Sequence, residues 1–170
     1  MTSITLSFEV HQPFRLREKV NENSKNLIDR YFDIELNKFY LDRISEKCYF
    51  KANEIILDLI DRFKKEKKKF KVSFSISGIF LEAAEKYKRD LLESFRELAK
   101  KKEVEILCET YYHSIVSLHW NYEEFIKQIE MQREILSSLL NVKSKVFVNT
   151  EMIFNNKIAK IVEDLGFKAI

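Results

Sequence analysis

His11, Glu109 and Glu151 are the side chains whose types and positions most suggest chemistry. Each stands just after a short apolar run that we interpret as a β-strand. In barrel-type folds with parallel strands, catalytic groups lie at the carboxyl ends of the strands. A carboxylate there can act as a nucleophile or transfer a proton, and an imidazole can donate or accept a hydrogen bond. Glu151 is the leading candidate because a helix begins soon after it.

Polar residues recur at alternate positions within these strands. The residues of one parity are Thr5, Ser7, Glu9 and His11 in the first strand, Ser73, Ser75 and Ser77 in the second, Glu105 and Glu109 in the third, and Asn149 and Glu151 in the fourth. Successive strand residues point to opposite faces, and buried parallel strands are usually apolar on both faces. The repeated polar face predicts side chains that converge on a polar lumen. The alternative interpretation is a sheet that is partly solvated on one face.

Strand-like runs alternate with amphipathic helical stretches along the chain. The strands are expected at 4–10, 71–77, 104–108 and 145–149, and the helices at 45–65, at 81–101, from 122, and from a start capped by Asn156. The apolar stripes of these helices are Ile55, Ile56, Leu59, Ile60 and Phe63; Leu91, Leu92, Phe95 and Leu98; Phe125, Ile129, Leu136, Leu139 and Leu140; and Ile158, Ile161, Val162 and Leu165. This alternation predicts a parallel α/β fold. Asn121 is expected to cap the third helix and Gly166 to follow the last one.

The longest connection and the final residues stand out. The segment 14–44 exceeds ordinary βα loop lengths, so we expect it to form either a lid over the site or a small helical hairpin. Residues 167–170 start a fifth strand, which would leave an unpaired sheet edge and an uncovered face. We therefore expect the chain to be a truncated form of a larger domain.

Composition limits the class of protein. The chain has 170 residues and is 45% hydrophobic, which suits a single domain over 1–170. Its 30 basic and 27 acidic residues require neither a nucleic-acid nor a membrane partner. The lysine-rich segment 64–71 crosses a predicted helix end, where cations suit the helix dipole. Cys48 and Cys108 form no CxxC pair, and the sequence shows no signal or membrane segment, so the predicted location is the cytoplasm.

Three segments match, in order, the motifs of a known enzyme family. They are Phe8–Phe14 with His-Gln-Pro, Lys102–His113 with Glu105, and Asn149–Asn156 with Asn-Thr-Glu. These segments resemble the first three sequence regions of glycoside hydrolase family 57, in a form similar to its α-amylase branch. Two positions depart from that pattern. Lys102 stands where a glycine often precedes the second region's glutamate, and Val148 stands where an arginine is expected.

The resemblance implies a fold and a reaction. The family's fold is an incomplete seven-stranded β/α barrel, and this chain would supply its N-terminal portion, about four β/α units plus the start of a fifth strand. The implied reaction is retaining hydrolysis or transfer on an α-glucan or maltooligosaccharide, with no cofactor and no metal. Glu151 would be the nucleophile that forms the glycosyl-enzyme.

A retaining mechanism also needs a proton donor, about 5–5.5 Å from the nucleophile. In the family this general acid is an aspartate in a fourth region further along the chain, and no residue here matches it. We therefore expect the chain alone to be inactive and to need the C-terminal part of the barrel as its partner.

The resemblance also assigns substrate binding to residues around Glu151. They are His11 and Gln12 at the floor of the site, Glu105, Glu109 and His113 as hydrogen-bonding or ordering groups, and Tyr111, Tyr112 and Trp120 as ring faces for a pyranose. The aromatic residues could instead pack in the core. His119 belongs to no motif and is expected on the surface.

Two other classes of function compete with this one. The chain could be a non-catalytic remnant, or a carbohydrate-binding or interaction fragment of the same barrel. A metal-dependent deacetylase on a similar barrel is disfavoured. His11, His113 and His119 do not have the His-x-x-x-His spacing of its ligands, and the sequence contains no Asp-Asp pair.

Overall fold

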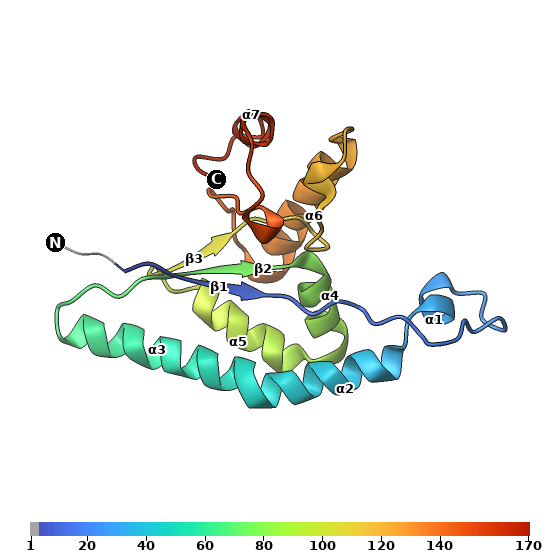
Figure 1. Ribbon diagram of the computed structural model, residues 1–170. Coiled ribbons are helices and arrows are strands. Elements are labelled where there is room, and N and C mark those ends of the chain that lie inside the picture. The colour runs from blue at the N-terminus through green and yellow to red at the C-terminus, as the bar shows by residue number, and fades with distance from the viewer. Residues whose placement is uncertain (1–3) are drawn as a thin grey trace.

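The centre of the protein is a three-stranded parallel sheet. The computed structural model describes residues 4–170. Its strands are β1 (Leu6–Val10), β2 (Val72–Ile76) and β3 (Val104–Leu107), in the order β1-β2-β3 (Figure 1). Their β-branched and aromatic residues suit a pleated, half-buried surface. The α/β class with parallel strands is thus confirmed.

Helices follow each strand. They are α1 (Leu27–Tyr31), α2 (Ile34–Ile44), the π-helical η1 (Ser45–Tyr49), α3 (Phe50–Lys65), α4 (Gly78–Tyr87), α5 (Arg89–Ala99), the 3-10 turn η2 (Val116–Leu118), α6 (Glu123–Leu140), the 3-10 turn η3 (Thr150–Met152) and α7 (Asn156–Asp164). α3 packs on α5 and α5 packs on α6, so the helices succeed one another beside the sheet in the order of the strands (Figure 1). None of the helices within residues 4–170 has the length and apolar character needed to cross a membrane.

Beyond β3 the parallel order continues as single bridges. Cys108 pairs with Phe147, and Val146 pairs with Ala169. Backbone hydrogen bonds of 2.8 to 3.0 Å hold these bridges. The predicted fourth and fifth strands therefore lie in the expected order, but they form single bridges and not regular ladders.

Two predicted helices differ from the observed ones. The helix predicted at 45–65 belongs to a longer helical path through α2, η1 and α3. The helix predicted at 81–101 is two helices, because Lys88 leaves the helical conformation with φ −150° and ψ 67°. The Lys88 ammonium lies 3.3 Å from carboxylate oxygens of Asp42 and Glu46, which ties the junction of α4 and α5 to α2 and η1.

The segment 14–44 has structure of its own. It contains α1 and α2, capped by the side chains of Asn26 and Asp33, and an isolated antiparallel bridge joins Leu16 to Phe32. Figure 1 shows α1 and its flanking loops as an arm that extends away from the sheet.

The core follows most of the predicted helix stripes. The α5 stripe of Leu91, Leu92, Phe95 and Leu98 is at most 2% exposed, as predicted. Ile55 was expected on the buried side of α3 but is 57% exposed. The buried side of this helix runs through Asn53, Ile56 and Ile60, and Ile55 lies about 100° from Ile56 around the helix axis.

The last helix begins one residue earlier than its predicted cap implied. Asn155, not Asn156, is the N-cap, and its side-chain oxygen accepts hydrogen bonds from the amides of Lys157 at 3.0 Å and Ile158 at 2.9 Å. The prediction for the other end is confirmed. Gly166 adopts φ +84°, the left-handed conformation that glycine provides after a helix.

Candidate functional site

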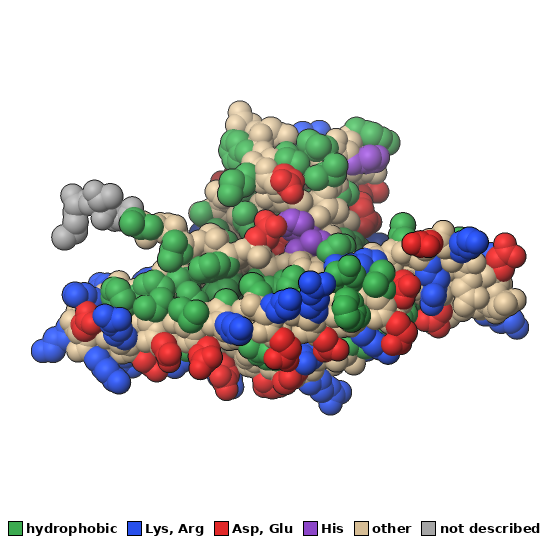
Figure 2. All heavy atoms as spheres, turned by 60° about the horizontal axis from the view of Figure 1, so that its bottom comes forward, with side chains coloured by type: hydrophobic (Ala, Val, Ile, Leu, Met, Phe, Trp, Pro, Cys, Tyr) green, Lys and Arg blue, Asp and Glu red, His purple; other side chains and the backbone are tan. Residues whose placement is uncertain are grey.

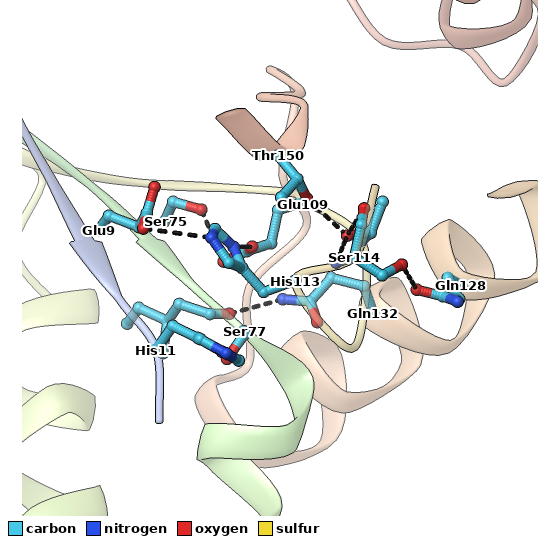
Figure 3. Close-up of polar contacts among 12 residues, drawn as sticks. Glu9, His11, Ser75, Ser77, Glu109, His113, Ser114, Gln128, Gln132 and Thr150 are labelled. Atoms are coloured by element: carbon cyan, nitrogen blue, oxygen red, sulfur yellow. Dashed lines mark hydrogen bonds and ion pairs between the residues drawn. The ribbon is translucent and has the colours of Figure 1, made fainter. Parts of the chain in front are cut away.

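Polar side chains from three neighbouring parallel strands meet at the carboxyl ends of those strands (Figure 3). His11 follows β1, Ser77 follows β2, and Glu109 and His113 follow β3. In Figure 2 histidine side chains lie beside acidic ones on the face that this end presents. The shared parity read from the sequence therefore corresponds to real proximity for these residues.

Glu109 is the buried carboxylate of the cluster. Its side chain is 0% exposed. The Ser75 hydroxyl donates to Oε1 at 2.7 Å, and Oε2 lies 2.5 Å from Nδ1 of His113. A buried carboxylate needs such partners because ionisation away from water is otherwise costly.

His113 lies between two carboxylates. Its Nδ1 faces Glu109, and its Nε2 lies 3.2 Å from Oε1 of Glu9. The hydrogen bond with Glu109 is the largest cause that raises the pKa of His113, and the charges of Glu109, Glu9 and Glu151 add to it against the effect of burial. The residue adopts φ +52°, and its amide closes a turn by donating to the Thr110 carbonyl at 2.9 Å.

His11 stacks on His113 but has the opposite electrostatic character. The ring centroids are 4.6 Å apart and the ring planes differ by 29°. Nδ1 of His11 lies 2.9 Å from the Ser77 hydroxyl oxygen. Burial first, and then the charge of His113, lower the pKa of His11 to about 4. At neutral pH the His11 ring is therefore uncharged.

Glu151 stands at the rim of this cluster in η3. It is exposed and adopts φ 56° and ψ 23°, and Met152 after it also has a positive φ of 54°. The hydroxyls of Thr110 and Thr150 lie 2.9 Å apart and tie η3 to the loop after β3. The charge of Glu151 contributes to the rise in the pKa of His113. Left-handed backbone at non-glycine residues is costly and concentrates at functional sites.

Other predicted site residues have their contacts elsewhere. The amide of Gln12 donates to the Tyr49 hydroxyl at 3.4 Å. Tyr111 is 8% exposed, and its hydroxyl donates to Glu82 at 2.9 Å. Trp120 is 82% exposed and its ring lies beside His119.

Tyr111 is explained by local packing, and Glu105 lies in another part of the molecule. Tyr111 packs so closely on Gly78 that a Cβ there would lie 2.3 Å from the ring, so this tyrosine fills the space between α4 and the loop after β3. Glu105 is exposed near the amino end of β3, where it lines a separate surface cavity of about 400 Å³. Four residues along a strand separate Glu105 from Glu109 by roughly 13 Å.

Several residues of the cluster were not predicted as site residues. Glu9 and Ser75 had been noted only for their strand parity. Gln132 of α6 donates to the Ile76 carbonyl at 2.7 Å and leaves its own Oε1 buried without a partner. Asn149 is 4% exposed, and its amide nitrogen donates to Ser117 and to the Ile153 carbonyl. The Asn-Thr-Glu motif marked Asn149, but nothing in a helical sequence marks Gln132.

A metal is not assigned to this site. Within residues 4–170 no group of three or more histidine, cysteine, aspartate or glutamate side chains is arranged to hold a metal ion. The arrangement offers hydrogen bonds, an imidazole with a raised pKa and two exposed carboxylates, those of Glu9 and Glu151. These groups suit nucleophilic attack by Glu151 and the binding of hydroxyl groups.

Fold and site together define an α/β protein with an acidic and imidazole-containing site at the carboxyl ends of parallel strands. The model of glycosyl hydrolase family 57 matches residues 5–170, and the chain belongs to that family. It is 47% identical over 167 residues to a Methanocaldococcus jannaschii protein named "Putative alpha-amylase", a match that covers 98% of this chain and 35% of that protein. The chain thus spans about a third of the length of this curated relative.

Solved structures share the fold at low sequence identity. The 4-alpha-glucanotransferase from Thermococcus litoralis matches with a TM-score of 0.67 and 20% identity, over 96% of this chain and 21% of that one. The alpha-amylase AmyC from Thermotoga maritima matches with a TM-score of 0.64 and 11% identity, over 96% of this chain and 38% of that one. At these identities the likeness concerns the fold alone.

Proposed function

We propose that this chain forms part of a retaining glycoside hydrolase that acts on α-glucans, with Glu151 as the nucleophile. The observation that carries the proposal is the position of Glu151. It is an exposed carboxylate, held in a left-handed conformation directly after Thr150, whose hydroxyl lies 2.9 Å from that of Thr110 in the loop that carries Glu109 and His113. Membership of glycosyl hydrolase family 57 supports the reaction class.

In this mechanism the Glu151 carboxylate attacks the anomeric carbon and the bond to the leaving oxygen breaks. A second carboxyl group must protonate that oxygen and later activate water. Glu109 is unsuited to this task because it is 0% exposed and both its oxygens already have partners. We assign the general acid to an aspartate that these 170 residues do not include, so the chain alone should not turn over substrate.

The substrate is proposed to be an α-glucan or a maltooligosaccharide. The names of the similar proteins, an alpha-amylase and a 4-alpha-glucanotransferase among them, support this class of substrate. Hydrolysis and transfer would both proceed through the same covalent step. Neutral His11 and the His113–Glu109 pair would form the polar floor. Trp120, whose ring is 82% exposed, would offer a face to a sugar ring.

The nucleophile can be tested without the general acid. In 5-fluoro-α-maltosyl fluoride the leaving group is the anomeric fluoride, which needs no proton. Attack by Glu151 should therefore form a stable glycosyl ester as the anomeric C–F bond breaks. We expect mass spectrometry of the folded chain to find one sugar on the peptide that contains Glu151. Glu151→Gln should give no adduct, and Glu105→Gln, the matched control, should still give one.

Two outcomes would contradict the proposal. A folded chain that is never labelled at Glu151 would remove its role as nucleophile and favour a non-catalytic, carbohydrate-binding fragment. Sustained turnover of maltooligosaccharides by the 170-residue chain, abolished in Glu151→Gln, would instead show that the general acid lies within these residues.

A further inference from the structure

The contacts of His113 determine its protonation state. Nδ1 lies 2.5 Å from a Glu109 oxygen and Nε2 lies 3.2 Å from a Glu9 oxygen (Figure 3). A neutral imidazole has one N–H and one lone pair, so it can donate to only one carboxylate and would point its lone pair at the other. The imidazolium form donates to Glu109 and forms an ion pair with Glu9. The geometry therefore favours the cation.

The surroundings of His113 explain why a cation is needed there. Two carboxylates contact this ring, from Glu9 on β1 and Glu109 after β3, and the charge of Glu151 in η3 adds to the rise in its pKa. Glu109 is fully buried, and the hydrogen bond to its other oxygen comes from the neutral Ser75 hydroxyl. A buried carboxylate without a cationic partner is strongly destabilising. Loss of the His113 proton would leave the buried Glu109 carboxylate without a cationic partner.

The positive charge resides on His113 and not on His11. The two rings stack at 4.6 Å, so charging both would be unfavourable. Nδ1 of His11 contacts the Ser77 hydroxyl, which can form a hydrogen bond with a neutral ring. The pKa of His11 is lowered, whereas the pKa of His113 is raised. The stacked pair thus carries one proton charge, on the ring that faces the carboxylates.

We propose that His113 is a positioning residue whose imidazolium joins Glu9 to Glu109, and that its charge sets the upper pH limit of the covalent step at Glu151. The second half of this inference rests on the proposed function of Glu151. The bridge connects the end of β1 to the loop after β3, and the turn to the Thr110 carbonyl holds the ring in place. When His113 loses its proton, the floor of the site loses the positive charge that neutralises Glu109. It also loses the ion pair with Glu9 that links the ring to β1.

The bridge is tested by NMR of the imidazole nitrogens. The chain has three histidines, so His11→Asn and His119→Asn assign the ring signals. We expect both nitrogens of His113 to carry protons at pH 7, and Glu9→Gln to lower the pKa of His113. Glu109→Gln should lower the pKa of His113 further. If the buried amide prevents Glu109→Gln from folding, Glu9→Gln alone is sufficient to test the bridge. The bridge would be overturned if His113 carried a single ring proton at pH 7, or if the pKa of His113 were the same in Glu9→Gln as in the wild type.

The pH limit is tested by the rate of Glu151 labelling with 5-fluoro-α-maltosyl fluoride. His113→Asn is the informative variant, because asparagine tolerates the left-handed backbone and can still donate to Glu109 but cannot carry charge. In the wild type we expect labelling to slow at least fivefold as pH rises through the His113 pKa measured by NMR. The variant should label more slowly at pH 6 and show no such decline.

The outcomes separate the two proposals. A decline at the same pH in the wild type and in His113→Asn would overturn the pH limit. Absence of labelling at every pH would overturn the proposed function together with the pH limit, whereas the NMR result would still decide whether His113 forms the bridge.

Discussion

The two stacked histidines show how strongly a few contacts separate chemically identical side chains. His113 gains two carboxylate partners, so its pKa is raised, and His11 gains only a hydroxyl and a cationic neighbour, so its pKa is lowered to about 4. Sequence parity placed His11 in the site, and the family resemblance added His113. Which ring carries the proton depends on distances that no sequence pattern specifies.

His11 should make the stability of the fold depend on pH. Between about pH 6.5 and pH 4 the unfolded chain binds a proton at His11 that the folded chain does not, so acidification through this window favours unfolding. Compared with His11→Asn, which keeps a polar group near Ser77, the wild type should lose roughly 1 kcal/mol of unfolding free energy across the window, after allowance for solvent screening. Urea unfolding at pH 7 and pH 4.5 measures this difference. Parallel pH dependences of the wild type and His11→Asn would contradict it, and His119→Asn, outside the cluster, is the control.

At the scale of elements, helix positions were predictable because apolar periodicity is strong, whereas some helix ends were not. The α5 stripe was predicted residue by residue, yet the break at Lys88 and the N-cap of α7 at Asn155 were missed. Asn155 and Asn156 are equally good caps by residue type. Only the backbone conformation of Asn155, with φ −154° and ψ 165°, lets its side chain reach the helix amides.

The cap assignment can be tested with adjacent residues as a matched pair. Asn155→Ala removes the acceptor for the amides of Lys157 and Ile158 and should destabilise the chain by about 1 kcal/mol in urea unfolding. Asn156→Ala changes the exposed first residue of α7. It should lower the free energy of unfolding by no more than a few tenths of about 1 kcal/mol, since alanine is a good helix former. A larger cost for Asn156→Ala than for Asn155→Ala would show that the cap lies one residue later.

For the whole molecule, β1 is the most exposed part of the sheet. It pairs with β2, and the structure shows no partner on its other edge within residues 4–170. Leu6 is 41% exposed and Phe8 is 37% exposed, and Figure 2 shows hydrophobic side chains as a band beside the charged outer face of the helical layer. An unpaired edge with apolar residues invites pairing with another chain.

A charge on this edge should therefore reduce self-association. We expect Leu6→Lys to lower the fraction of oligomers seen in sedimentation velocity several-fold, because a lysine on an edge strand opposes edge-to-edge pairing. Ile55→Lys replaces an apolar residue that is 57% exposed on α3, and it should leave association unchanged. If both substitutions reduce association equally, general solubility and not the β1 edge is responsible.

The sequence by itself determined the alternation of strands and helices, the core stripes, and three motifs whose order indicated the family. These features are local or periodic, and each is expressed in the types of neighbouring residues. Tertiary structure alone decided that Glu9, Glu109 and His113 form one bridge, that Glu105 lies away from it, and that Tyr111 packs on Gly78. Such contacts join residues from different strands and loops. Their distances depend on how the sheet, the helices and the turns pack together, which a one-dimensional pattern does not contain.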